Sequence, residues 1–270
     1  MLKAVLNKRT FVFRNVMNIF TRKICAKVKV NNLNIHYEKV GNGPKTVLLL
    51  PGALGTARLD FGPQLDNLDG NKFTLIGWDP PGYGKSRPPE RNFNDFYQKD
   101  ASLAAKMMVN LGIPKYSILG WSDGGMTGII VSANNPNNVD KLAIWGSKAY
   151  ISEKDRNNAI KIIDTSKWSA SAREPLEAVY GVEGLKTMST NFVESYCKYS
   201  EICKDEVQRL KCPTFVLHGD KDFITAAEHV DYFSSNIRNV RIHRWPEGKH
   251  NVHLKYSKEF NQLIEKFLLE

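Results

Sequence analysis

The sequence has few cysteines and lacks the motifs that would bind a metal or a cofactor. Its four cysteines form no C-x-x-C pair, which excludes zinc-knuckle and thioredoxin-like patterns. We find no phosphate-loop pattern, no internal repeat and no low-complexity tract. We therefore expect no metal, no cofactor and free thiols in a reducing compartment. The cysteines are Cys25, Cys197, Cys203 and Cys212.

Acidic residues are absent from the first 37 positions of the 270-residue chain. Eight of the 38 basic residues lie within residues 1–29, and the rest of the chain nearly balances its 28 acidic residues. The formal net charge of +10 therefore describes one end of the chain rather than its body. A nearly neutral body gives no support to a nucleic-acid partner.

The basic N-terminal segment also lacks a long apolar run. Its longest uncharged stretch, residues 15–21, is too short and too polar for a membrane span or a secretory signal. We expect no stable membrane insertion. A basic, acid-free and potentially amphipathic composition is typical of a mitochondrial transit peptide. We interpret residues 1–26 as such a leader; a disordered basic tail or a peripheral membrane-binding helix on a cytoplasmic protein is the alternative.

The body of the chain alternates short apolar runs with helical patterns. Alternating apolar residues on both sides of Asn31-Asn32 predict a hairpin of two half-exposed strands. Helical spacing is clear at residues 104–111 and 257–268, with Ser257 expected as an N-cap. Six further apolar runs predict buried parallel strands at residues 47–50, 73–78, 116–120, 142–145, 214–217 and 240–245. The sequence thus predicts an α/β fold with a mostly parallel eight-stranded sheet.

One interval, residues 151–210, interrupts this alternation. It contains no convincing strand and is rich in Lys, Glu and Asn, with helical patterns at residues 154–164 and 183–197. We expect a helical cap inserted between strands 6 and 7, over a core made of residues 27–150 and 211–270. A separate small helical domain is the alternative.

The clearest chemical motif is the G-x-S-x-G of residues 120–124. It follows a predicted strand and precedes a predicted helix, which is the context of a nucleophile on a sharp turn. The small glycines allow the backbone to bend tightly and lift the Ser122 hydroxyl above the strand ends. We therefore predict that Ser122 is a nucleophile.

A serine nucleophile needs a base and an acid, which follow it along the chain in this fold. Asp222 lies after the predicted strand at 214–217, and His250 lies after the last predicted strand. Asp220 and His253 are their rivals. Asp220 is more typical of a turn, and His253 has entered the run that leads to the last helix. We therefore predict Asp222 as the acid and His250 as the base.

Acyl transfer also needs backbone donors for the oxyanion. One is expected to be the N–H of Asp123, the residue after the nucleophile. The other is expected from the loop after the third strand, residues 51–55, where Ala53 is the first candidate and Leu54 the second. A simple turn at the exit of the strand is the alternative reading of that loop.

Taken together, these motifs resemble the α/β-hydrolase superfamily, and within it the biphenyl hydrolase-like (valacyclovir hydrolase) family. The matching stretches include LLLPGALGTARLDFGPQL, LGWSDGG, HGDKD and PEGKHNVHL, spread over residues 28–268. The resemblance implies an α/β-hydrolase fold and a mitochondrial esterase that acts on α-amino acid esters, including amino-acid prodrugs. It also implies the triad Ser122, Asp222 and His250.

The resemblance assigns a second role to Asp123, recognition of the substrate's α-amino group. Burial of a carboxylate is costly unless it is paired, and an ammonium group would pair with it. The alternative is that Asp123 caps the helix that begins there.

We expect a small-molecule ester substrate and a monomer. The rival functions are a meta-cleavage C–C bond hydrolase, a general carboxylesterase, and a non-catalytic binding protein of the same fold.

Overall fold

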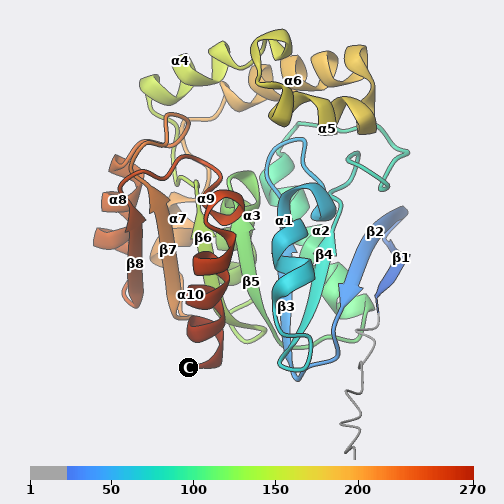
Figure 1. Ribbon diagram of the computed structural model, residues 1–270, viewed down its shortest axis with the longest axis vertical. Helices are drawn as coiled ribbons and strands as arrows, with labels where there is room; N and C mark the ends of the chain where they lie inside the picture. Colours follow the sequence, from blue (N-terminus) through green and yellow to red (C-terminus); the bar gives the residue numbers. More distant parts are fainter. Residues whose placement is uncertain (1–22) are drawn as a thin grey trace, which may run out of the picture.

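The computed structural model describes residues 23–270, so most of the predicted leader lies outside the described residues. The described chain forms one eight-stranded sheet in the order β1-β2-β4-β3-β5-β6-β7-β8 (Figure 1). The β1–β2 and β2–β4 pairs are antiparallel, and all other pairs are parallel. The strands are β1 (Ile24–Val30), β2 (Leu33–Val40), β3 (Lys45–Leu50), β4 (Phe73–Trp78), β5 (Tyr116–Trp121), β6 (Val139–Trp145), β7 (Thr214–Gly219) and β8 (Val240–Trp245).

Helices cover both faces of this sheet. The helices are α1 (Ala57–Asn67), α2 (Phe96–Asn110), α3 (Asp123–Asn134), α4 (Glu153–Lys161), the 3-10 turn η1 (Thr165–Lys167), α5 (Ala170–Tyr180), α6 (Val182–Tyr196), α7 (Lys204–Gln208), α8 (Glu228–Asn236), α9 (Val252–Lys255) and α10 (Ser257–Leu269). Helices α1 and α10 pack on one face, and α2 and α3 pack on the other (Figure 1). This arrangement confirms the predicted fold class.

The apolar runs form strands because both faces of the sheet are buried. In β3, Leu48 and Leu50 enter the core on the side of α2 and α3, whereas Val47 and Leu49 enter the core on the side of α1 and α10. A strand that contributes to two cores needs apolar residues at every position rather than at alternate ones. The continuous runs in the sequence reflect this double burial.

Residues 151–210, all of them described, contain helices and no strand. Helices α4, α5 and α6 lie over one end of the sheet (Figure 1). Hydrogen bonds attach these helices to loops of the core, among them the following two. Tyr180 of α5 donates to the carbonyl of Leu54 at 2.8 Å, and Ser195 of α6 donates to the carbonyl of Phe93 at 2.6 Å.

Three details differ from the sequence-based expectations. Ser257 is the first residue of α10 and does not cap it; Tyr256 precedes the helix. Helix α1 was not predicted; Pro63 lies inside it, and the backbone of Phe61 departs from helical geometry. Strand β1 starts at Ile24, inside the segment 1–26 expected as a leader.

All four cysteines, each within residues 23–270, are free thiols, as expected. Among the helices of the same range, none is both long and apolar enough to cross a membrane.

Candidate active site

Ser122 occupies a strained turn between β5 and α3. Its backbone has φ 53° and ψ −120°, a conformation that costs a non-glycine residue on the order of 1–3 kcal/mol. The turn is held by hydrogen bonds from the Ser122 N–H to the Trp145 carbonyl and from the Gly125 N–H to the Ser122 carbonyl, both 2.9 Å. A β-carbon at Gly124 would overlap the Leu50 carbonyl, which explains the small residue there.

Asp222 and His250 are joined in the structure. Oδ2 of Asp222 lies 2.8 Å from Nδ1 of His250, and the Asp222 side chain is buried. Its Oδ1 accepts hydrogen bonds from the backbone N–H groups of Ile224 and Thr225 at 2.8 and 2.9 Å. Burial alone would raise the pKa of Asp222, but the His250 imidazole and the two N–H groups lower it below its ordinary value. The carboxylate is therefore ionised and can orient the imidazole.

The two rivals have other partners. Asp220 lies at the surface and pairs with Arg244 at 2.6 Å. His253 is fully buried, and both of its ring nitrogens are occupied: Nδ1 accepts from the Trp145 indole and Nε2 donates to the Asp60 carbonyl, each at 2.8 Å. Burial lowers the pKa of His253 to about 3. His253 is thus a neutral cross-link between helix α1 and β6.

His250 packs beside the turn that carries Ser122. The Trp121 indole donates to the His250 carbonyl at 3.0 Å, and the two rings lie 5.4 Å apart. A β-carbon at Gly146 would lie 2.8 Å from Cε1 of His250, so the imidazole sits directly on the loop after β6. Within the described residues the Ser122 hydroxyl makes no hydrogen bond, and the Ser122–His250 bond is not formed. Such bonds often tighten only when substrate is present.

The loop after β3 lies against the nucleophile. A β-carbon at Gly52 would lie 3.3 Å from the Ser122 β-carbon. The Gly52 N–H donates to Oδ2 of the buried Asp60 at 2.9 Å, so this N–H is not available to an oxyanion. The N–H groups of Ala53, Leu54 and Asp123 donate to no other group in residues 23–270, so Ala53 and Leu54 both stay candidates for the second donor. Each of these N–H groups is therefore available to an oxyanion.

Asp123 is a buried carboxylate beside the nucleophile. The Tyr97 hydroxyl donates to its Oδ1 at 2.9 Å, whereas its buried Oδ2 has no partner among the described residues. Burial raises the pKa of Asp123 to about 6, against the lowering effect of Tyr97 and Arg91. Asp123 lines a small cavity with the buried ion pair Arg91–Asp100, whose charges already compensate each other. The site therefore carries an uncompensated negative charge when Asp123 is ionised.

No motif in the sequence pointed to Tyr97, Arg91 or Asp100 as residues of the site. Tyr97 and Asp100 lie in α2, and Arg91 lies in the loop before it, outside every motif. Their side chains reach Asp123 and its cavity only because α2 packs against α3.

Known proteins share both the sequence and the fold of this chain. A family described as the alpha/beta hydrolase fold matches residues 45–167. The serine hydrolase BPHL of Mus musculus is 44% identical over 249 residues, which cover 90% of this chain and 86% of that protein. A 2-hydroxy-6-oxononadienedioate/2-hydroxy-6-oxononatrienedioate hydrolase of Escherichia coli is 34% identical over 269 residues, with coverage of 87% and 91%.

A solved structure extends this likeness to the fold. The esterase of Exiguobacterium antarcticum has a TM-score of 0.75 at 20% identity and covers 92% of this chain and 100% of its own. The chain therefore belongs to the α/β-hydrolase fold family and, within it, to the family of the serine hydrolase BPHL, the biphenyl hydrolase-like serine hydrolases.

Proposed function

We propose that this serine hydrolase cleaves carboxylic esters of α-amino acids through a triad of Ser122, His250 and Asp222. The observation that carries the substrate assignment is the buried, unpartnered Oδ2 of Asp123, one residue from the nucleophile. A buried carboxylate oxygen without a partner is costly, and a substrate ammonium group would supply the missing partner.

The reaction follows from the roles of the three side chains. Nδ1 of His250 donates to Asp222, which leaves Nε2 to accept the proton of the Ser122 hydroxyl. Ser122 Oγ then attacks the ester carbonyl, and the Ala53 and Asp123 N–H groups bind the resulting oxyanion. The imidazolium returns its proton to the departing alcohol, which leaves an acyl-enzyme. Water, deprotonated by His250, releases the amino acid and regenerates Ser122.

A helix cap explains Asp123 less well. Asp123 is the first residue of α3, where a negative charge is favourable. Within residues 23–270, however, its carboxylate accepts a hydrogen bond from Tyr97 of α2 and none from the N–H groups of α3. A capping role would leave Oδ2 without a use.

A matched pair of esters tests the proposal. L-alanine ethyl ester and ethyl propanoate differ only in the α-amino group. We expect the wild type to prefer the amino ester, and Asp123→Asn to lower kcat/KM for that ester by about 10- to 100-fold. Ethyl propanoate hydrolysis should stay near wild type, because the Asp123 N–H is retained.

Ser122→Ala is the control for the reaction itself and should abolish turnover of both esters. Equal losses on both esters in Asp123→Asn would assign Asp123 a structural role. Equal wild-type rates on both esters would favour a general carboxylesterase, the nearest rival.

A further inference from the structure

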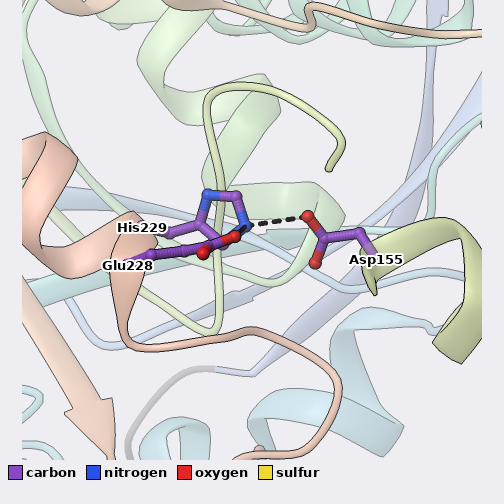
Figure 2. A group of neighbouring side chains, drawn as sticks. All are labelled: Asp155, Glu228 and His229. Atoms are coloured by element: carbon purple, nitrogen blue, oxygen red, sulfur yellow. Dashed lines mark hydrogen bonds and ion pairs between the residues drawn. The ribbon is translucent and has the colours of Figure 1, made fainter. Parts of the chain in front are cut away.

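A buried ion cluster lies between the helices over the sheet and the loop that carries Asp222. It consists of Lys148, which follows β6, Asp155 in the first turn of α4, and His229 of α8. All three side chains are buried. The Lys148 ammonium lies 2.8 Å from Oδ1 of Asp155. Nε2 of His229 lies 2.9 Å from Oδ2 of Asp155, and Figure 2 shows this contact.

The cluster has the residue types of a metal site but not its bonding. Asp155, Glu228 and His229 present ligand atoms close to one another (Figure 2). Both oxygens of Asp155 are already occupied, because Oδ2 also accepts from the N–H and hydroxyl of Ser152. The ammonium of Lys148 stands where a cation would bind. Hydrogen bonding from His229 and the charge of Lys148 hold the pKa of Asp155 well below its usual range, although burial opposes them.

Lys148 also reaches the loop of the triad acid. Its ammonium donates to the Ile224 carbonyl and to the Tyr196 hydroxyl, both at 3.0 Å. Together with Oδ1 of Asp155, these two acceptors use all three N–H groups of the Lys148 ammonium. The Ile224 N–H donates in turn to Asp222 at 2.8 Å. Ile224 is therefore held on one side by Lys148 and on the other by the carboxylate that orients His250.

The neighbouring residue strengthens this connection. The Thr225 N–H donates to Asp222, and its hydroxyl donates to the Gly146 carbonyl at 2.9 Å. Gly146 is the residue on which the His250 ring rests. The loop after β6 thus contacts the imidazole at Gly146 and holds the acid loop through Lys148.

We propose that Lys148, held by Asp155 and His229, is a positioning residue that fixes the loop of residues 222–225 so that Asp222 faces His250. Asp155 belongs to α4 and Tyr196 to α6. The Lys148 ammonium therefore links the position of these helices over the sheet to the geometry of the triad. This inference rests on the proposed triad. A buried ion pair is weak evidence for stability, and its best-attested use is to select one arrangement of the chain.

The test compares variants by the rate at which a fluorophosphonate labels Ser122. This probe has no ammonium group, so its labelling rate measures the reactivity of Ser122 without a contribution from ammonium binding at the Asp123 carboxylate. Lys148→Met keeps the length of the side chain and removes its donors. We expect labelling to slow by about 10- to 100-fold, the cost of a small displacement of catalytic groups. The strongly deshielded NMR signal of the proton between His250 and Asp222, identified by its loss in Asp222→Asn, should shift or broaden.

Two further variants make the result decisive. Glu228→Gln alters a neighbour in Figure 2 that makes no bond to Lys148 or to the acid loop, and it should match wild type. Lys148→Met combined with Asp155→Asn leaves no unpaired charge, so it should fold even if the single variant does not. It should show the same loss. A folded Lys148 variant with wild-type labelling and an unchanged proton signal would overturn the inference, whereas failure of wild-type Ser122 to react would overturn the triad instead.

Discussion

At the scale of single residues, Asp123 combines deep burial with a pKa raised to about 6. An ionised carboxylate is required to bind an ammonium group, so recognition should be lost as Asp123 takes up a proton. The ratio of kcat/KM for L-alanine ethyl ester to that for ethyl propanoate isolates this step, since the titration of the triad affects both esters.

We therefore expect this ratio to fall by up to tenfold per pH unit below about pH 6. It should fall again above about pH 8, where an α-amino group loses its proton. Steady-state kinetics from pH 5 to pH 9 measure both limbs, and Asp123→Asn should flatten the acid limb. A ratio that stays constant between pH 5 and pH 7 would contradict recognition by an ionised Asp123.

The triad residues could be predicted from the sequence, because their order along the chain is characteristic of the fold. Residues that reach the site only through tertiary packing could not be predicted. Asp222 and His250 were selected over Asp220 and His253 from their places after two strands, and the structure joins that pair. Tyr97 and Lys148 carry no motif. Their partners, Asp123 and Ile224, lie 26 and 76 residues away along the chain. Only the packing of helices and loops brings these groups together.

At the scale of elements, the turn between β5 and α3 depends on close contact with the end of β3. The Gly124 α-carbon faces the Leu50 and Pro51 carbonyls, which are backbone atoms that cannot rotate away. Gly124→Ala should therefore destabilise the protein by about 3 kcal/mol. It should also displace the loop that carries Ala53, and so lower kcat.

Urea unfolding and ester kinetics test this expectation together. Gly184→Ala in α6 is the matched control, because a β-carbon there meets only Tyr180 at an ordinary 3.6 Å. That control should be neutral or stabilising by up to about 1 kcal/mol, with unchanged kcat. If Gly124→Ala were as stable and as active as the control, tight approach would not be the reason for this glycine.

Strands were easier to predict than helices because burial on two faces leaves a continuous apolar run. Each of the six predicted parallel runs lies within an observed strand. Helix α1 was missed because it is held by distant partners rather than by its own pattern. The side-chain amide of Gln64 donates to the His253 carbonyl and to Asn261, each at 3.0 Å, and Thr56 caps the first turn. Tertiary contacts of this kind are not visible in local sequence.

At the scale of the whole molecule, the position of strand β1 limits where a leader could end. Strand β1 pairs with β2 from Ile24 to Val30, and Asn110 of α2 donates to the Lys29 carbonyl at 2.8 Å. A leader that ended at residue 26 would remove the first three residues of this strand. The edge of the sheet therefore favours a boundary before Ile24, which the composition of the segment could not locate.

We predict that the leader directs the protein to mitochondria and is not needed for catalysis. Residues 1–30 fused to a fluorescent protein should give a mitochondrial signal in cells, because a basic, acid-free segment is typical of a transit peptide. A chain that starts at Ile24 should stay in the cytosol and keep wild-type kcat and stability. Removal of residues 1–30 should instead delete strand β1, expose the edge of β2 and destabilise the protein. Diffuse cytosolic fluorescence of the fusion would contradict mitochondrial targeting. Loss of activity on removal of residues 1–23 would show that this segment is needed for catalysis and is not only a leader.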